Sequence, residues 1–274
     1  MIKVLLRGRL GNHLFQYAFA KIAAQKLKTK FILDTNDVPR DIYWFNLDLP
    51  YRFLNNPLIF KIYNLFQKQL KFSKTKDYND CTLPQEAVIL EEDSLYLGYF
   101  QYSKMLEEYR DVLIKTFTIK KKIEGIFKLK YPIFQTAKKT LVISVRLGDY
   151  RNTFLAEYNN APIIIKFEWY YKVLTTLNLK DYHVFIISDE IEFVEKEFSF
   201  PGLNALFVKE HPSIQFQMLT NADIAVLSNS TFAWWGGFLN TKPGKRIIAP
   251  KYFLGHNIGI EFPNGIQSKL FEWV

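Results

Sequence analysis

The feature that most constrains this chain is a regular alternation of two hydrophobic patterns after residue 140. Short apolar runs rich in β-branched residues are typical of buried strands, and apolar residues at helical spacing are typical of amphipathic helices. The predicted strands cover residues 141–145, 183–188, 205–208, 223–227 and 246–249. The predicted helices between them cover residues 167–178, 190–198, 213–220 and 232–239. Strands that alternate with helices form parallel sheets, so this half is predicted to be a doubly wound α/β domain.

The first part of the chain begins with the same alternation. Residues 2–6 form an apolar run, apolar residues from Phe15 to Ile22 follow at helical spacing, and residues 31–34 form a second run. This order of strand, helix and strand is the seed of another parallel sheet.

The length of 274 residues is enough for two domains of ordinary size. Residues 118–140 are rich in lysine and weakly patterned, so we take them as the approach to a domain boundary. The predicted domains are residues 1–135 and residues 136–274. The predicted fold class is therefore α/β, with two Rossmann-like domains whose parallel sheets face a cleft.

The composition narrows the partners and the compartment. A formal net charge of +9 favours polyanions, namely nucleic acid, anionic lipid or phosphorylated substrates. No RNA-recognition, helix-turn-helix or zinc-finger signature is present, so we expect no nucleic-acid partner. Cys81 is the only cysteine, which excludes a disulfide framework and fits a reducing compartment. With no signal peptide and no run of 18 apolar residues, we expect a cytoplasmic protein, free or peripheral to the inner face of the plasma membrane.

A basic segment, residues 61–76, interleaves lysines with Ile62, Leu65 and Phe66. One interpretation is an amphipathic helix with a solvated basic face. The other is peripheral contact with a membrane or with a lipid-linked acceptor. The surrounding residues 36–80 are predicted to be a loop-rich insertion, because aromatic residues stand there among Asn and Pro.

Polar residues gather where four of the predicted strands end, and ligands of open α/β sheets bind at the carboxyl ends of strands. Glycine lets the backbone approach a ligand closely. Hydroxyls and the N–H groups at a helix N-terminus bind phosphate, and Arg binds phosphate with two hydrogen bonds. The candidate site residues are Gly8, Gly11, Asn12, His13, Ser144, Arg146, Asp149, Ser188, Asp189, Ser228, Asn229, Ser230 and Thr231.

Each group also has a purely structural interpretation. Residues 8–13 fit a tight turn, and Arg146 with Asp149 fits an ion pair. Ser188 fits the cap of the helix that follows it.

The same segments resemble the α-1,2-fucosyltransferase family, glycosyltransferase family 11. Residues 8–20, Gly-Arg-Leu-Gly-Asn-His-Leu-Phe-Gln-Tyr-Ala-Phe-Ala, look like the family's opening G-x-L-G-N-Q-x-F-Q-Y-A-F. Residues 228–239 resemble its S-N-S-S-F-S-W-W-G-A-W-L segment. The other similar segments, in family order, are residues 97–102 to L-E-G-Y-x-Q-S, 144–150 to H-x-R-R-G-D-Y, 187–190 to F-S-D-D and 248–250 to I-A-P.

The resemblance implies a GT-B type fold and an inverting, metal-independent glycosyltransferase. It would move L-fucose from GDP-fucose to a hydroxyl of a galactoside in an α-1,2 linkage, in surface-glycan or O-antigen synthesis. The implied partners are this nucleotide-sugar donor and a glycan acceptor, free or lipid-linked. No cofactor and no metal are expected, and the chain has no D-x-D triplet of the kind that metal-dependent glycosyltransferases use.

The resemblance also implies roles for single residues. Arg146 would contact the donor's phosphates, and residues 228–231 would hold the pyrophosphate. Gly8, Gly11 and Asn12 would approach the donor or the acceptor. Residues 36–80 and 150–165 are expected to shape the acceptor pocket.

The expected chemistry is attack of the acceptor hydroxyl on the anomeric carbon, from the face opposite GDP. Negative charge grows on the leaving pyrophosphate, and Arg146 with the N-terminus of the helix after Thr231 would stabilise it. Asp149 is the first candidate for the general base and Glu157 the second. The alternative role of Asp149 is to orient Arg146.

Four positions depart from the family pattern. Ser144 replaces its His, Leu147 its second Arg, His13 its Gln, and Gln215 an acidic residue. In related enzymes that His and that carboxylate help to hold guanosine. A carboxylate accepts both guanine N–H groups, whereas the amide of Gln215 offers one acceptor. Phosphate binding is therefore expected from the retained residues, and guanine binding from the resemblance alone.

Two alternatives follow from these departures. One is transfer of another deoxy sugar, from GDP or from another nucleotide. The other is a non-catalytic glycan-binding homologue, which the changes at Ser144 and Leu147 motivate.

Overall fold

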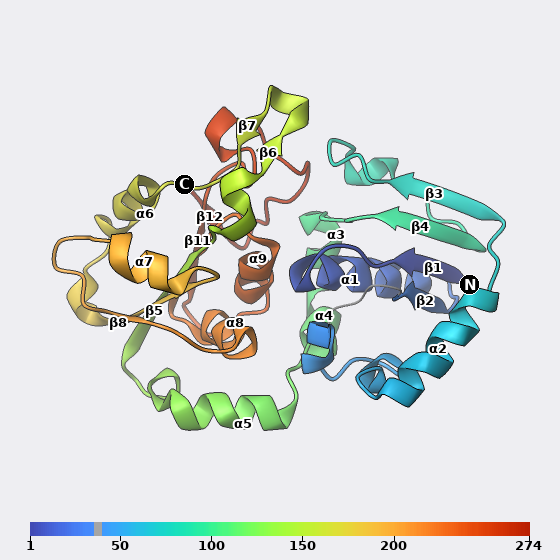
Figure 1. Cartoon of the computed structure of the whole chain (residues 1–274), viewed down its shortest axis with the longest axis horizontal. Helices are drawn as coiled ribbons and strands as arrows, with labels where there is room; N and C mark the ends of the chain where they lie inside the picture. Colours follow the sequence, from blue (N-terminus) through green and yellow to red (C-terminus); the bar gives the residue numbers. More distant parts are fainter. Residues whose placement is uncertain (36–39) are drawn as a thin grey trace. The chain divides into compact units, whose positions relative to one another are not determined.

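The computed structural model describes residues 1–35 and 40–274 (Figure 1). The chain forms two compact units. Unit 1 consists of Met1–Lys120 and Pro263–Ser268, and unit 2 of Lys121–Phe262 and Lys269–Val274. Among the described residues, no helix is both long and apolar enough to span a bilayer.

Unit 1 contains a four-stranded, fully parallel sheet in the order β2-β1-β4-β3. The predicted seed of this sheet is confirmed, because the first three elements are a strand, a helix and a strand within the expected residues. The strands are β1 (Ile2–Leu5), β2 (Phe31–Asp34), β3 (Lys74–Tyr78) and β4 (Ser94–Gly98). The helices are α1 (Leu10–Lys26), α2 (Pro57–Gln69), α3 (Ser103–Glu108) and α4 (Arg110–Thr116).

Helix α2 runs beside β2, one edge of the sheet in unit 1 (Figure 1), and its side chains bond to the backbone of that edge. The Tyr63 hydroxyl accepts a hydrogen bond from Leu33 N (3.0 Å) and donates one to Leu33 O (2.7 Å). The amide oxygen of Gln67 accepts a hydrogen bond from Thr35 N (3.3 Å). An uncovered edge strand presents unpaired N–H and C=O groups that promote aggregation. The inner face of α2 is therefore polar because it satisfies β2.

Three predictions for unit 1 are corrected. The basic segment 61–76 is not one helix, because α2 ends at Gln69 and β3 begins at Lys74. Apolar residues at helical spacing predict one helix over residues 101–117, but the structure has two, since the backbone of Tyr109 leaves the helical region (φ −109°, ψ 16°). The loop-rich insertion 36–80 contains α2 and β3, and residues 36–39 of it lie outside the described residues.

Unit 2 contains a six-stranded parallel sheet in the order β12-β11-β10-β5-β8-β9. All five predicted strands are present, and the sixth, β12, was missed because its two residues are too few to show a period. The strands are β5 (Lys139–Val145), β8 (Tyr182–Ser188), β9 (Ala205–Phe207), β10 (Ile224–Val226), β11 (Arg246–Ala249) and β12 (Glu272–Trp273). A separate antiparallel pair consists of β6 (Phe154–Leu155) and β7 (Ala161–Pro162).

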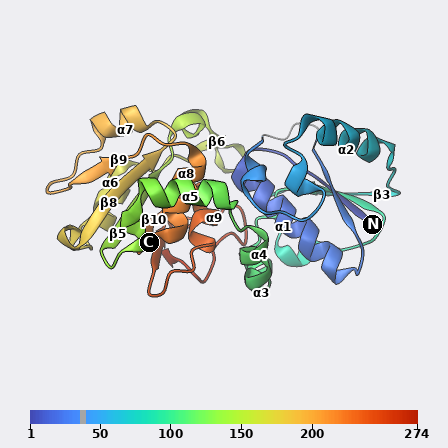
Figure 2. The ribbon, with the colours of Figure 1, turned by 90° about the horizontal axis from the view of Figure 1, so that it is seen from below.

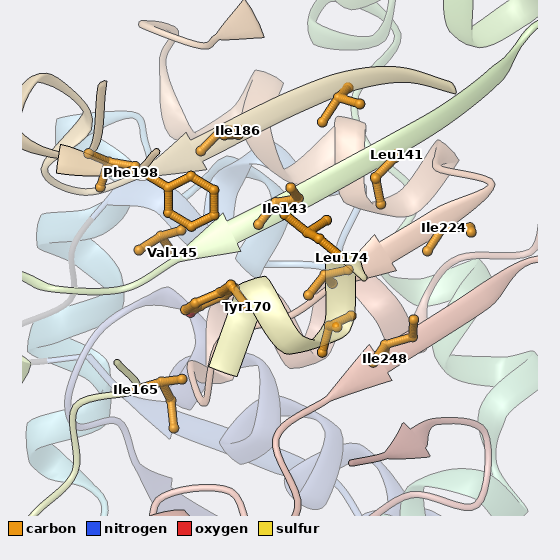
Figure 3. Packing of buried hydrophobic residues seen from close by; sticks show 14 of the residues in the cluster. Leu141, Ile143, Val145, Ile165, Tyr170, Leu174, Ile186, Phe198, Ile224 and Ile248 are labelled. Atoms are coloured by element: carbon orange, nitrogen blue, oxygen red, sulfur yellow. The ribbon is translucent and has the colours of Figure 1, made fainter. Parts of the chain in front are cut away.

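The core on one face of this sheet shows why β5 sits at its centre. Leu141, Ile143 and Val145 alternate along β5 and are almost fully buried. Figure 3 shows them on the side where Tyr170 and Leu174 of α6 (Phe167–Leu174) pack. Helix α7 (Ile191–Glu197) adds to the same cluster. Alternate residues of a strand point to opposite faces, so the remaining residues of β5 face the second helical layer.

The second helical layer of unit 2 accounts for the position of the division between the units. It contains α5 (Lys121–Lys130), α8 (Pro212–Asn221) and α9 (Thr231–Phe238), and α8 lies beside both of the others (Figure 2). Phe134, which follows α5, packs on Phe185 of β8 with ring centroids 5.0 Å apart. Residues 121–135, which we assigned to the first domain, therefore belong to unit 2, and the division falls at Lys120.

Candidate functional site

The strand order of unit 2 marks one place for a ligand. Counted along the chain, the sheet reads 3-2-1-4-5-6, and the chain changes direction between β5 and β10. Open α/β sheets bind their ligands outside the carboxyl ends of the strands at such a switch point. Arg146 directly follows β5 there, and residues 227–230 connect β10 to α9. The structure thus brings together the two predicted phosphate-binding segments of unit 2.

Arg146 is held by three neighbours. One terminal nitrogen, Nη1, pairs with Asp189 Oδ2 at 3.0 Å, and the other, Nη2, pairs with Asp149 Oδ1. The guanidinium carbon lies 5.1 Å from the centroid of the Tyr150 ring, a cation–π distance. The side chain is 17% exposed, so the guanidinium is oriented in advance and still reaches the surface. The structural interpretation of the Arg146–Asp149 pair is confirmed as a contact.

Asp189 connects the loop after β5 to the end of β8. Its Oδ1 accepts a hydrogen bond from Leu147 N (3.0 Å), and its Oδ2 pairs with Arg146. The loop passes so close that a Cβ on Gly148 would lie 2.3 Å from Asp189 Oδ2. Only a glycine fits there without displacing the carboxylate, so Gly148 and Asp189 together fix the position of Arg146.

Ser188 does not cap α7 as predicted. Its Oγ accepts a hydrogen bond from Glu190 N (3.0 Å), which is a local turn, and the N-cap of α7 is Glu190. Glu190 pairs instead with Arg151, whose Nη2 lies 2.9 Å from its carboxylate. A short hydroxyl two residues before an N–H group favours such turns, and that competes with capping.

A hydrogen-bonded link joins the two segments at the switch point. The Tyr150 hydroxyl donates to Asn229 O (3.3 Å), and the Asn229 amide nitrogen donates to Ile163 O (2.6 Å). Asn229 is fully buried, and Ser228 is 1% exposed. Asn229 Oδ1 and Ser228 Oγ have no hydrogen-bond partner among the described residues. An unsatisfied buried polar atom costs about 1–3 kcal/mol, so these two oxygens are candidates for hydrogen bonds to a bound molecule.

The N-terminus of α9 is left open. Ser230 is its N-cap in extended conformation (φ −101°, ψ 134°), but the side chain makes no capping hydrogen bond. The helix is fixed behind this end, because Trp234 and Trp235 are buried and a Cβ on Gly236 would lie 2.6 Å from Leu219 Cβ. Uncapped N–H groups at a helix start bind anions. Ser230 and Thr231 therefore lie where a phosphate would be bound.

The two positions predicted to touch the nucleoside are placed on neighbouring elements. Ser144 is buried near the end of β5, and Gln215 is half-buried on α8. The Gln215 amide nitrogen donates to Glu210 O (2.9 Å), which turns its oxygen away from that contact. Glu157, the second candidate for the base, lies outside the residues whose side chains the structure describes.

Unit 1 has a switch point of its own, between β1 and β4. The loop after β1 needs Gly8, because its φ is +82° and a Cβ would lie 2.3 Å from Asn12 Nδ2. The Asn12 amide oxygen accepts a hydrogen bond from Gln101 Nε2 (3.0 Å). Gln16 bridges the same two strands, accepting from Arg7 N (2.9 Å). Its amide nitrogen donates to the carbonyl of Gly98, at the end of β4 (3.0 Å).

The predicted loop of residues 8–13 is shorter than expected. Helix α1 begins at Leu10, so Gly11, Asn12 and His13 lie in its first turn. His13 is 1% exposed. Burial lowers the pKa of its imidazole to about 4, and a hydrogen bond with the backbone of Gly8 opposes the shift in part. His13 is therefore neutral at pH 7.

Three residues that shape these sites were not singled out from the sequence. Gln16 and Gln101 lie within the motifs of residues 8–20 and 97–102, and Tyr150 ends the motif of residues 144–150. In the sequence, Gln16 could have been noticed as a polar residue on a helix face that is otherwise apolar. In the structure it is fully buried. A polar residue on a buried face is hydrogen-bonded, which marks it as a structural link.

The model of the family described as Glycosyl transferase family 11 matches residues 60–256, which is more than half of the chain. The chain belongs to this family. It is also 25% identical to the O-antigen biosynthesis glycosyltransferase WbnK of Escherichia coli, over 92% of this chain and 95% of that protein. The resemblance inferred from the motifs is confirmed, and the protein is a glycosyltransferase.

Solved structures with a similar fold include three fucosyltransferases. NodZ from Bradyrhizobium has a TM-score of 0.52 at 14% identity, covering 87% of this chain and 93% of that one. POFUT1 in complex with GDP has a TM-score of 0.52 at 11% identity, covering 90% and 97%. Arabidopsis thaliana FUT1 in complex with GDP has a TM-score of 0.51 at 12% identity, covering 91% and 70%. The predicted GT-B type fold, with two parallel α/β units, is confirmed.

The acidic and histidine side chains near the candidate residues do not gather into a metal site. Within the described ranges 1–35 and 40–274, no group of three or more His, Cys, Asp or Glu side chains is placed to hold a metal ion. The carboxylates at the unit 2 switch point, Asp149 and Asp189, both contact Arg146 instead.

Proposed function

We propose that this glycosyltransferase transfers L-fucose from GDP-fucose to a galactoside hydroxyl, forming an α-1,2 linkage with inversion, in O-antigen or other surface-glycan synthesis. The observation that carries the proposal is the switch point of unit 2. There an oriented Arg146 and the open N-terminus of α9 flank a loop in which the buried Ser228 hydroxyl has no partner among the described residues. This combination suits a diphosphate, which offers several acceptor oxygens and negative charge to N–H donors.

The leaving group explains why these donors matter for the reaction. As the glycosidic bond breaks, negative charge grows on the diphosphate. Arg146 and the first-turn N–H groups of α9 stabilise that charge, and because they are already oriented they need no rearrangement. Asp189 and Gly148 are positioning residues in this scheme, since they hold Arg146 through the 3.0 Å contact and the close loop approach.

Asp149 is the proposed general base. Its side chain is 48% exposed and lies within three residues of Arg146, so it is the accessible carboxylate of this loop. The acceptor oxygen forms its bond to the anomeric carbon, the bond to the GDP oxygen breaks, and the hydroxyl proton passes to Asp149. The donor phosphate takes over the guanidinium N–H groups that Asp149 occupies in the free protein.

The choice of guanine as the base and of fucose as the sugar is supported by the similarity to known proteins, not by specific residues of this chain. The WbnK relative is an O-antigen enzyme, and solved proteins of this fold bind GDP or GDP-fucose. In this chain the Gln215 oxygen supplies one acceptor for a guanine N–H group. We assign the acceptor sugar to the neutral amides of unit 1, Asn12 and Gln101.

The test has two steps. Thermal-shift titrations with GDP, UDP, CDP and dTDP should show the largest stabilisation with GDP. Turnover of GDP-fucose, GDP-mannose and dTDP-rhamnose with a lactose acceptor should then give product from GDP-fucose, with the linkage read by NMR. A larger shift with another nucleotide contradicts the base. Transfer of another sugar contradicts fucose, and GDP binding without any transfer or donor hydrolysis contradicts catalysis.

A further inference from the structure

The outer face of α2 is apolar although it faces solvent. Four of its side chains are more than half exposed: Leu58 at 66%, Ile62 at 59%, Leu65 at 57% and Phe66 at 52%. Their spacing of four, three and one residues places them on a single face of the helix. A soluble helix normally buries such a stripe, so a contiguous exposed stripe marks a binding surface.

The helix cannot bury this stripe by turning over. Its opposite face carries Tyr63 and Gln67, both buried, which satisfy the open edge of β2. Rotating α2 would leave the N–H and C=O groups of Leu33 unpaired, at a cost of several hydrogen bonds. The N-cap fixes the helix further, because the Asn56 side chain accepts from Leu58 N (3.0 Å) and Ile59 N (3.3 Å).

Basic residues predominate around the stripe, and Asp48, which lines the groove beside Leu49, is paired with Lys21. From Leu49 to Lys76 the chain carries six basic residues and no Asp or Glu. Lys74 and Lys76 pair with Glu91. The exposed Lys61, Lys68 and Lys71 have no acidic partner within the part of the chain that the structure describes. Lys61 and Lys68 are seven residues apart, so they line one side of the apolar stripe.

The apolar surface continues beyond the helix. In the loop before it, Leu49 is 68% and Phe53 is 49% exposed. A groove of about 590 Å³ runs from Leu49 to Phe66 and has the rings of Tyr51 and Tyr63 in its wall. We call the combination of this loop, the outer face of α2 and Lys61, Lys68 and Lys71 the α2 surface.

We propose that the α2 surface docks on an anionic lipid bilayer, lying in the interface with its apolar stripe among the headgroups and its lysines on the anionic lipids. A helix with an apolar stripe, a basic edge and no acidic residues is the pattern of interfacial helices. Each lysine near an anionic bilayer adds about fivefold to the partition coefficient. A protein partner would have to be both apolar and uniformly acidic, whereas a bilayer meets both demands. The inference does not depend on the sugar or the nucleotide.

Vesicle flotation of the full chain tests this proposal without any substrate. We expect the protein to float with vesicles of phosphatidylcholine and phosphatidylglycerol, and much less with phosphatidylcholine alone. Replacing Lys61, Lys68 and Lys71 by Gln should lower the partition coefficient about 100-fold. Replacing Ile62 and Phe66 by Gln should lower the partition coefficient about 100-fold, since each apolar side chain contributes about 1.5 kcal/mol or more. This loss should persist in 0.5 M salt, which screens the lysines but not the apolar contact.

Two matched controls separate the α2 surface from general charge and stickiness. The first control replaces Lys138, Lys172 and Lys180, which are all exposed in unit 2, by Gln. It lowers the net charge from +9 to +6, as the lysine variant of the α2 surface does. The second control replaces Leu129 and Leu206, which are 83% and 51% exposed, by Gln. It matches the replacement of Ile62 and Phe66 in the number of exposed apolar side chains removed. Both controls should float like the wild type, and all variants should have the melting temperature of the wild type.

The proposal is overturned by wild-type protein that stays out of the anionic vesicles, or by control variants that lose as much binding as the α2 variants. It is also overturned if light scattering after size exclusion shows a dimer that Ile62→Gln with Phe66→Gln converts to monomer. In that case the stripe binds a second copy of the chain rather than lipid.

Discussion

The switch points of the two units of this enzyme both lie at the ends of parallel strands, and they differ in which side chains join the strand ends. In unit 2, Arg146 stands between two carboxylates at the ends of β5 and β8. In unit 1 the ends of β1 and β4 are joined by neutral amides, Asn12 with Gln101 and Gln16 with the backbone. Full charges stabilise a diphosphate, whereas amides match the hydroxyls of a sugar. The difference supports the proposal that unit 2 binds the donor and unit 1 the acceptor.

The largest expected effect tests the charged side of this comparison. Arg146→Ala removes the oriented cation and should lower kcat for sugar transfer by about 10²–10³, because the leaving diphosphate loses a preorganised donor. Steady-state kinetics with GDP-fucose measures it. Arg146→Lys is the control, since it keeps the charge but loses the two-pronged contact, and should recover only part of the rate. If Arg146→Ala has nearly wild-type turnover, the proposed role of Arg146 in stabilising the leaving diphosphate is wrong.

Much of the charged switch point could be predicted because its parts are local in sequence. The runs before Arg146 and Ser228 are short, apolar and rich in β-branched residues, so strand ends could be placed within a residue or two. The partnership of Arg146 with Asp189 was not predictable in this way. It depends on β5 and β8 being neighbours in register, which periodicity does not reveal.

The second prediction uses two glycines with matching geometry. A Cβ on Gly148 would lie 2.3 Å from Asp189 Oδ2, and one on Gly8 would lie 2.3 Å from Asn12 Nδ2. Gly148→Ala should weaken GDP binding roughly tenfold or more, because displacing the carboxylate releases Arg146, and overpacking costs about 1–3 kcal/mol. Isothermal titration calorimetry with GDP measures the effect.

Gly8→Ala is the counterpart in unit 1. It adds a left-handed backbone penalty of about 1–2 kcal/mol, so it should lower stability in denaturant unfolding while the Kd for GDP stays unchanged. Equal losses of GDP affinity in the two variants would contradict the division of chemistry between the units.

The third prediction concerns pH and unit 1. Burial lowers the pKa of His13 to about 4 from an ordinary 6.5, so between these values the unfolded chain binds a proton that the folded chain does not. The free energy of unfolding therefore falls as the pH drops, by about 2 kcal/mol between pH 7.5 and pH 5. His13→Gln, the residue of the family pattern, should remove this part of the slope in urea unfolding. An unchanged slope would mean that His13 is not the titrating group.

Helix α2 shows where sequence reasoning stops for physical reasons. Its apolar period predicts a helix, yet amphipathicity gives two faces and does not say which one is buried. The polar face is inside because Tyr63 and Gln67 satisfy β2, a contact about thirty residues away in sequence. The lysines of the same segment continue into β3, so composition placed the helix end too late. Tertiary hydrogen bonds overrode the pattern in both respects.

The smallest expected effect compares the starts of two helices. At α2 the Asn56 side chain caps the helix, while at α9 the Ser230 side chain leaves the first-turn N–H groups open. Ser230→Ala should therefore cost almost no stability but weaken GDP binding about tenfold, through one lost hydrogen bond to phosphate. Asn56→Ala should do the reverse, costing about 1 kcal/mol of stability with no change in GDP affinity. Thermal unfolding and GDP titration of both variants measure the contrast. A stability loss in Ser230→Ala equal to that of Asn56→Ala, with unchanged GDP binding, would mean that the start of α9 is an ordinary capped helix rather than a phosphate site.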